Sequence, residues 1–336
     1  MRARTIASCL TARGHDVKIA ASGRAVGILR GHGFDVTEID GMTMRYEAGA
    51  VRRARTVADL LRQAPRAIRR NARAALATGF VPDAVVTDFD SFAHAIGKIL
   101  NVPTISVDHQ HVFDRFHHPP RVVARLSSDR AARAFVSAKT ARCDAYVVTS
   151  FFFPRERARN TTPTFLVGPI VRPELERVTP TSGEHVVVYQ TTAGDPRLLE
   201  ALRGARARFV VYGLGRSEKL GNVELRAFDE AAFVSDLASA RAVIANGGFT
   251  AISEAVYLGK PILSVPVRGQ PEQELNAAWV GELGVGESAP LLSSRVIDEF
   301  LARAPHFRKM QDARIRTGTR DACDAVCGAL ATRRAA

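Results

Sequence analysis

A glycine pair and a carboxylate lie close together in residues 246–277, which read NGGFTAISEAVYLGKPILSVPVRGQPEQELNA. Gly247 and Gly248 precede a helix predicted for Ala251–Leu258, and Glu254 falls within that helix. Glycines allow an anionic group to approach the backbone N–H groups at the positive end of a helix. A carboxylate beside them can accept hydrogen bonds from both hydroxyls of a ribose. The segment therefore predicts a pocket for a sugar nucleotide.

Two more segments follow predicted strands of the second half of the chain. Thr191 and Thr192 come directly after the strand His185–Tyr189 and offer hydroxyl and N–H groups to a phosphate. Phe228 follows a short strand at Val223–Leu225 and is placed to touch a base. Open α/β sheets bind ligands outside the carboxyl ends of their strands. We therefore expect all three segments to meet at one edge of a sheet.

The elements that must position these residues alternate between strand and helix, which predicts a parallel α/β architecture. With 336 residues, the chain is long enough for two domains. In the first half, strands are predicted at Asp16–Ala20, Ala84–Asp88, Thr104–Asp108 and Ala145–Thr149, and helices at Thr5–Ala12, Ser22–His32, Ser91–Leu100 and Pro120–Ala141, with one or two basic helices over Ala48–Ala77.

Residues 166–183 are rich in Pro, Gly and Thr and lack helical periodicity, so we predict an interdomain linker there. The domains are then 1–165, the acceptor-binding side, and 184–336, the donor-binding side with C-terminal helices. In the second half we predict further strands at Arg208–Tyr212, Ala242–Ala245 and Ile262–Val265, and helices at Asp195–Gly204, Ala231–Ser239, Glu272–Leu283, Ser294–Ala302 and His306–Thr332, the last of them broken or irregular.

In this order and spacing, the motifs of the second half resemble a known signature. Gly247-Gly248, Ser253-Glu254-Ala255, Gly259-Lys260-Pro261 and Asn276-Ala277 are similar to the donor-binding segment of GT-B glycosyltransferases. The likeness is to the group that contains the lipid II N-acetylglucosaminyltransferase and the UDP-glycosyltransferases. The linker phrase Val167–Ile170 is also similar to the interdomain segment of this group. The resemblance implies two Rossmann-like domains that face a cleft.

The resemblance also implies a role for each matching residue. Glu254 would hold the ribose hydroxyls of the donor, and the backbone of Phe228 would read its base. Gln270 or Gln273 would reach the sugar hydroxyls. The remaining donor residues would face the diphosphate: Gly247, Gly248, Phe249, Thr191 and Thr192.

A second likeness lies in the first half. Asp108-His109-Gln110-His111, after a predicted strand, resembles the Asp-x-Gln-His segment of a bacterial and archaeal branch of predicted GT-B transferases. Asp108, His109 and His111 are the candidates for the general base that deprotonates an acceptor hydroxyl. The histidines here and at His117 and His118 also raise a metal site as an alternative, but the resemblance implies metal-independent chemistry without a cofactor.

The start of the chain departs from the family pattern. Members of the group carry a strand and a Gly-x-Gly-His-type loop before the helix that matches Arg2–Leu10. We therefore expect the first domain to lack its first strand and a group that commonly serves the acceptor. One hypothesis is a misassigned start codon, with Met1 in place of an internal residue of a longer protein.

The charge and composition of the chain indicate which partners and which location to expect. The formal net charge is +13, and Arg residues far outnumber the six Lys residues. Several arginines crowd the region from Arg52 to Arg73, which favours either an anionic membrane surface or a solvated helix face. Nucleic acid is not an expected partner, because no nucleic-acid-binding module is recognised. Without a signal peptide or a membrane span, the expected location is the cytoplasm, with peripheral contact to the inner membrane face. The four cysteines are expected to be reduced thiols.

The sequence therefore predicts a hexosyl-type glycosyltransferase that moves a sugar from a nucleotide diphosphate sugar, with UDP favoured, to an acceptor hydroxyl. A lipid-linked acceptor fits the basic region. Two alternatives stay open: a UDP-sugar 2-epimerase on the same fold, and a catalytically inactive protein that binds sugar nucleotides.

Overall fold

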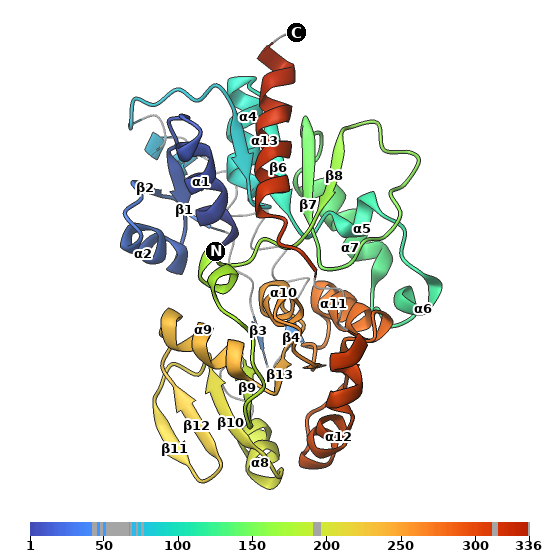
Figure 1. The fold of residues 1–336 in the computed structure, drawn as a ribbon. Coiled ribbons are helices and arrows are strands. Elements are labelled where there is room, and N and C mark those ends of the chain that lie inside the picture. Colours follow the sequence, from blue (N-terminus) through green and yellow to red (C-terminus); the bar gives the residue numbers. More distant parts are fainter. Residues whose placement is uncertain are drawn as a thin grey trace.

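The computed structural model describes residues 1–41, 46–47, 50–51, 67, 69–71, 73–74, 77–190, 196–310 and 315–334. Two α/β halves are arranged one above the other (Figure 1). The upper half in this view is built from the first part of the chain together with the C-terminal helix, Thr319–Arg334, and the lower half from the rest of the second part. The predicted α/β class with parallel sheets is confirmed.

The sheet of the first half is parallel, with the order β5-β6-β7-β8. Its strands are β5 (Val85–Thr87), β6 (Thr104–Asp108), β7 (Ala145–Thr149) and β8 (Thr164–Val167). A separate parallel pair is formed by β1 (Ile19–Ala21) and β2 (Val36–Glu38), and an antiparallel pair by β3 (Tyr46–Glu47) and β4 (Ala50–Val51). Helices of this half include α1 (Arg2–Ala12), α2 (Arg24–Gly31), α4 (Ser91–Leu100), α5 (Val112–Arg115), α6 (Pro120–Val123) and α7 (Asp129–Lys139).

The sheet of the second half has the order β11-β12-β10-β9-β13-β14-β15, with β11 as an antiparallel edge strand. Its strands are β9 (His185–Tyr189), β10 (Arg208–Tyr212), β11 (Glu218–Leu220), β12 (Val223–Arg226), β13 (Ala242–Ala245), β14 (Ile262–Ser264) and β15 (Gly286–Ser288). Helices packed around it include α8 (Pro196–Gly204), α9 (Glu230–Ser239), α10 (Phe249–Tyr257), α11 (Pro271–Glu282) and α12 (Ser294–Met310). The 3₁₀ helix η1 (Pro173–Arg177) lies between the two sheets in sequence.

Local sequence explains several of these boundaries. Every residue of β6, β7 and β13 is buried, as expected of central strands in a parallel sheet covered on both faces. The Asp90 carboxylate accepts hydrogen bonds from the backbone N–H groups of Phe92 and Ala93, which caps α4. Asp229 caps α9 in the same way through the N–H of Ala232. Short polar side chains thus begin helices directly after the strand ends.

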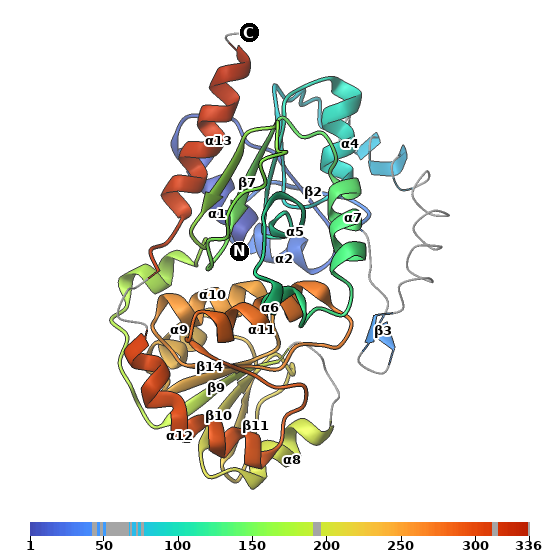
Figure 2. The ribbon, with the colours of Figure 1, turned by 90° about the vertical axis from the view of Figure 1, so that its right-hand side faces the viewer.

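The last helix, α13 (Thr319–Arg334), returns to the first half and packs against α1 and against β6, β7 and β8 (Figure 2). The sequence-based division assigned residues 184–336 as one unit to the donor side, whereas the structure places α13 with the first half. A contact between elements more than 300 residues apart has no local signal in the sequence.

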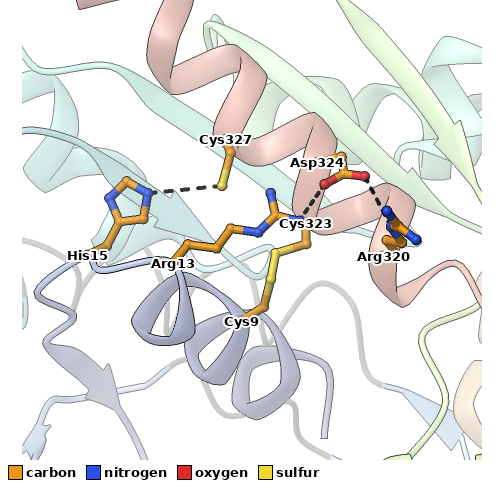
Figure 3. Close-up of a disulfide and its surroundings, with 7 residues drawn as sticks. All are labelled: Cys9, Arg13, His15, Arg320, Cys323, Asp324 and Cys327. Atoms are coloured by element: carbon orange, nitrogen blue, oxygen red, sulfur yellow. Dashed lines mark hydrogen bonds and ion pairs between the residues drawn. A yellow bond between two sulfur atoms is a disulfide. The ribbon is translucent and has the colours of Figure 1, made fainter.

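The packing of α13 on α1 also corrects the expectation of four reduced thiols. Cys9 and Cys323 form a disulfide between these two helices, with Cα atoms 6.5 Å apart (Figure 3). Cys143 and Cys327 are free. Arg13 pairs with Asp324 beside the disulfide, so a covalent and an ionic contact join the same two helices.

Several helix predictions differ from the structure. The helix expected at Ser294–Ala302 continues to Met310 in α12, and the segment His306–Thr332 is shared between the end of α12 and α13. The helix expected over Pro120–Ala141 is divided into α6 and α7, because Ser127 leaves the helical path and donates its N–H and hydroxyl to Glu274. The start of the basic helical region expected over Ala48–Ala77 is wrong, because Ala50–Val51 forms strand β4 and not a helix. Helical turns occur at 67, 69–71 and 73–74, but Arg52, and with it most of that region, lies outside the described residues.

Aromatic side chains fill the boundary between the halves. Phe152 of the first half stacks on Trp279 of α11 at 4.6 Å between ring centroids, and His109 stacks on Phe249 of α10 at 3.9 Å. These residues belong to, or border, one apolar cluster that continues across both halves. No described helix is both long enough and apolar enough to cross a bilayer.

Candidate functional site

The glycine pair lies at the carboxyl end of β13, where Gly248 caps the N-terminus of α10. A Cβ atom on Gly247 would lie 2.3 Å from the backbone oxygen of Gln273 and 2.7 Å from its Cα, so only glycine fits there. A Cβ on Gly248 would meet no atom within 4 Å. One glycine thus allows α10 and α11 to approach, and the other leaves the helix N-terminus open for an anion.

Glu254 lies one turn and a half into α10 and is 1% exposed. Its Oε1 accepts a hydrogen bond from Nε of Arg172 at 2.6 Å, while its Oε2 is buried and has no hydrogen-bond partner among the residues that the structure describes. Burial raises the pKa of Glu254, and the neighbouring guanidinium opposes that rise. An unpartnered buried carboxylate oxygen is costly, and a ligand hydroxyl would satisfy it.

Arg172, which the sequence prediction missed, connects this carboxylate to several other groups. Its guanidinium lies 4.9 Å from the ring centroid of Phe233 and 5.9 Å from that of Phe228. It also lies 3.5 Å from a carboxylate oxygen of Glu230. The one sequence feature that could have indicated Arg172 is its position directly after the apolar residues of the predicted linker, which read VGPIV.

The ion pairs continue into the first half through Arg4 of α1. Arg4 is 8% exposed, and its two terminal nitrogens donate to Glu230 at 3.3 and 3.4 Å. Glu230 therefore lies between Arg4 and Arg172. This row of charges joins the first helix of the chain to the carboxylate at the glycine pair.

The polar residues before and within α11 have different surroundings. Gln270 and Gln273 bond to each other through Oε1 and Nε2 at 2.6 Å, and Gln273 also accepts from the N–H of Val267. Glu272 instead accepts from Nε2 of Gln110 in the first half at 3.0 Å. Burial raises the pKa of Glu272. Glu272 is a second residue that the sequence prediction did not select.

His109, one of the three predicted catalytic residues, is fully buried. Its Nδ1 lies 2.8 Å from the carbonyl oxygen of Thr149, and its Nε2 lies 2.8 Å from Oδ1 of Asn276. Burial lowers the pKa of His109 to about 4. Asn276 also donates to the carbonyl of Gly247, so His109 contacts the glycine pair through this amide.

Asp108 and His111 form a second buried group, each 1% exposed. Both carboxylate oxygens of Asp108 lie within 2.9 Å of His111 Nδ1, and one of them accepts from Ser106. The nearby imidazole and hydroxyl hold the pKa of Asp108 well below its usual range, despite burial. The structure thus brings the three predicted residues together but buries all of them.

The other predicted residues are placed as follows. Phe228 is 53% exposed beyond the end of β12, with its ring 6.4 Å from that of Tyr212. Thr191 and Thr192 lie outside the described residues. In the described part of the chain, no three His, Cys, Asp or Glu side chains gather where they could hold a metal ion.

A family model described as "Glycosyl transferase family 1" matches residues 1–305. The chain belongs to this glycosyltransferase family. An uncharacterised glycosyltransferase of Methanosarcina acetivorans is 27% identical to it, over 81% of this chain and 77% of the relative. The expected resemblance to GT-B glycosyltransferases is therefore confirmed.

Two further proteins are similar to this glycosyltransferase. A UDP-N-acetylglucosamine–N-acetylmuramyl-(pentapeptide) pyrophosphoryl-undecaprenol N-acetylglucosamine transferase of Methylobacterium nodulans is 34% identical over 25% of this chain and 26% of its own. The structure of Phytolacca americana UGT2, complexed with UDP-2fluoro-glucose and pterostilbene, superposes with a TM-score of 0.66. It has 14% sequence identity and covers 98% of this chain and 96% of its own. This agreement in fold confirms the predicted GT-B fold class.

Proposed function

We propose that this glycosyltransferase transfers a hexose from a UDP-linked donor to an acceptor hydroxyl. The observation that carries the proposal is the buried Oε2 of Glu254, which lies beside the open N-terminus of α10 and has no hydrogen-bond partner within the described ranges of the chain. A carboxylate at this position accepts the ribose hydroxyls while the helix end faces the diphosphate. The UDP-dependent name of the Methylobacterium nodulans relative supports the choice of UDP.

The donor diphosphate departs with negative charge, and the protein offers fixed dipoles to stabilise it. The N–H groups at the start of α10 supply a positive helix end, and Gly248 leaves room for close approach. The backbone of Phe249 and the hydroxyls of Thr191 and Thr192 are proposed to complete this contact. With these groups present, the proposed chemistry needs no metal ion or cofactor.

Arg172 is proposed to change partners when the donor binds. Its guanidinium is near both Glu254 and the exposed ring of Phe228, where the base is expected. Ribose hydroxyls that bond to Glu254 would weaken its pairing with Arg172 and free the guanidinium for the diphosphate. Gln270 and Gln273, already bonded to each other, are proposed to turn toward the donor sugar.

A general base must reach the acceptor hydroxyl. Asp108, His109 and His111 are buried, so we propose that they support the boundary between the halves and that Asp88 accepts the proton. Asp88 follows β5, its side chain is 35% exposed, and its Oδ1 accepts from Nε of Arg2 at 3.0 Å. Glu272 and Gln110 bond to each other across the same boundary, where donor sugar and acceptor would meet.

A lipid-linked acceptor at the cytoplasmic face of a membrane is the proposed substrate class, based on the basic region Arg52–Arg73 and the polyprenol-linked substrate in the relative's name. The relatives reported above are transferases and give no support to the 2-epimerase alternative.

The proposed function is tested by incubating the protein with a panel of UDP-sugars and separating the products. UDP release with transfer or hydrolysis supports the proposal; interconversion of two UDP-sugars, or tight binding without any turnover, contradicts it.

A further inference from the structure

A concave basin lies on the second half, away from the glycine pair. It has a volume of about 760 Å³ and is lined at its rim by four arginines: Arg203, Arg206, Arg208 and Arg241. These residues lie at or before the amino ends of the strands, whereas the glycine pair follows the carboxyl end of β13. A strand of five residues spans roughly 16 Å, so the basin and the donor site lie at opposite edges of one sheet.

The sheet register brings the four arginines together from separate segments. Arg203 is in the last turn of α8, Arg206 is in the following loop, and Arg208 is the first residue of β10. Arg208 pairs with His185 at the start of β9, and Ala242, the neighbour of Arg241, pairs with Val186. Their backbones therefore start at the same edge, and their charges converge on one basin.

The loop that carries Arg206 is held in a fixed shape. Nδ2 of Asn222 donates to the carbonyls of Leu202, Ala205 and Ala207 at 3.0, 3.1 and 2.9 Å. The N–H of Arg206 donates to Oδ1 of Asp298 at 3.0 Å. The wall of the basin is thus built by side chains that bond the backbone, not by a chance arrangement of surface residues.

The basin has an excess of positive charge that composition does not explain. Four of its twelve lining residues are arginine, against 41 of 336 in the whole chain, and Glu184 is the one carboxylate among the lining residues. Within the described residues, Arg203, Arg206 and Arg208 form no side-chain ion pair or hydrogen bond. Some surface arginines elsewhere do pair, such as Arg295 with Glu299 and Arg303 with Glu287.

We propose that this basin binds a phosphate-bearing anion at a site separate from the sugar-nucleotide donor site. Planar guanidinium groups bind phosphate oxygens through paired hydrogen bonds, and several cations around a concavity attract a multiply charged anion. The anion is either a free polyphosphate or the phosphate headgroup of an anionic lipid. The second source would hold the donor-binding half against a membrane surface.

The test uses the full chain and two double variants with the same loss of charge. R206A/R208A removes two exposed arginines of the basin. R295A/R320A removes two exposed arginines that make single (i, i+4) pairs elsewhere. Calorimetry with inorganic triphosphate measures the free anion, and flotation with vesicles of phosphatidylglycerol or of phosphatidylcholine measures the lipid headgroup. UDP affinity, measured separately, reports on the donor site.

We expect R206A/R208A to weaken binding of triphosphate or of phosphatidylglycerol vesicles at least tenfold, with unchanged UDP affinity and thermal midpoint. R295A/R320A should bind as the wild type does. Binding of triphosphate alone identifies a soluble polyphosphate, and binding of vesicles alone identifies a lipid headgroup. Equal losses in the two double variants would show a diffuse charge effect and overturn the proposal, as would no binding of either probe by the wild type.

Discussion

The Nε of Arg172 lies 2.6 Å from Oε1 of Glu254, and both side chains are buried. One residue belongs to the segment between the sheets and the other to the glycine-pair helix. A buried pair of this kind is costly to break from one side, because the remaining charge has no partner. A change at this pair should therefore affect both the stability of the boundary between the halves and the proposed donor site.

The Arg172→Met substitution should destabilise the protein at neutral pH by about 3–5 kcal/mol, because Glu254 loses its cation. The pKa of Glu254 is already raised by burial and should rise further in the variant. A raised carboxyl pKa favours the folded state at low pH, and this contribution is lost as pH rises through the folded pKa. Denaturant melts at several pH values should therefore show the deficit of Arg172→Met shrinking toward acid pH. A deficit that does not depend on pH would contradict the pairing.

Gly247 and Gly248 offer a matched pair of alanine substitutions. Gly247→Ala places a Cβ against the Gln273 backbone, so we expect a loss of stability of about 1–3 kcal/mol together with loss of UDP binding. Gly248→Ala meets no protein atom and should leave the thermal midpoint unchanged, while a methyl group at the helix end weakens UDP binding. Thermal melts and UDP titrations separate the two. A large drop in the midpoint of Gly248→Ala, or normal UDP affinity in Gly247→Ala, would refute this assignment.

His109 predicts a pH dependence at the boundary between the halves. Burial lowers its pKa from 6.5 to about 4, so the unfolded chain binds a proton that the native protein does not. The resulting stability is present above pH 6.5 and is lost as pH falls toward about 4, which amounts to about 3 kcal/mol. His118, which accepts from Trp279 Nε1 at 3.1 Å, has a pKa lowered to about 4 for the same reason.

Denaturant unfolding between pH 7.5 and 4 measures this effect. His109→Gln and His118→Gln should each be less dependent on pH than the wild type, and the double variant least dependent. His306→Gln is the control, because His306 is exposed on α12 in the second half. Parallel pH curves for the wild type, the two single variants and the double variant would show that neither buried imidazole causes the pH dependence of stability.

The disulfide joins helices that are far apart in sequence. Cys9→Ser should lower stability by about 2–5 kcal/mol under oxidising conditions, since a long closed loop is lost from the unfolded chain. In a reductant, the wild type should match the variant. Cys327→Ser is the control, because Cys327 is a free thiol on the same helix. Peptide mapping without reduction should recover Cys9 linked to Cys323; a link of Cys9 to Cys327 would contradict the structure.

The sequence predicted most of what depends on local patterns. The strands Thr104–Asp108, Ala145–Thr149 and Ala242–Ala245 have the predicted bounds, since buried parallel strands are short apolar runs. The glycine pair and Glu254 were also identified from their spacing. These features are encoded by neighbouring residues.

What the sequence did not predict depends on contacts between distant segments. Arg172 had no local feature that indicated a carboxylate 82 residues later. Glu272 was not predicted as a site residue, whereas the neighbouring Gln270 and Gln273 were. Its hydrogen-bond partner, Gln110, lies in the other half of the protein, so no local pattern indicates the contact. His109 follows a strand, where cleft residues are expected, but it is buried by residues distant in sequence, including Phe249, which stacks on its ring, and Asn276. The return of α13, and with it the disulfide, is a tertiary contact of the same kind.

The most direct test of the central claim is the dissociation constant of UDP for the wild type and for Glu254→Gln, measured by calorimetry. Glutamine keeps the size of the side chain but replaces the charged acceptor at the ribose position. We expect the wild type to bind UDP and Glu254→Gln to bind it at least tenfold more weakly. The double variant Arg172→Met/Glu254→Gln is the control that removes the unpaired guanidinium. Equal UDP affinity in the wild type and Glu254→Gln, in folded proteins, would contradict the proposed donor site.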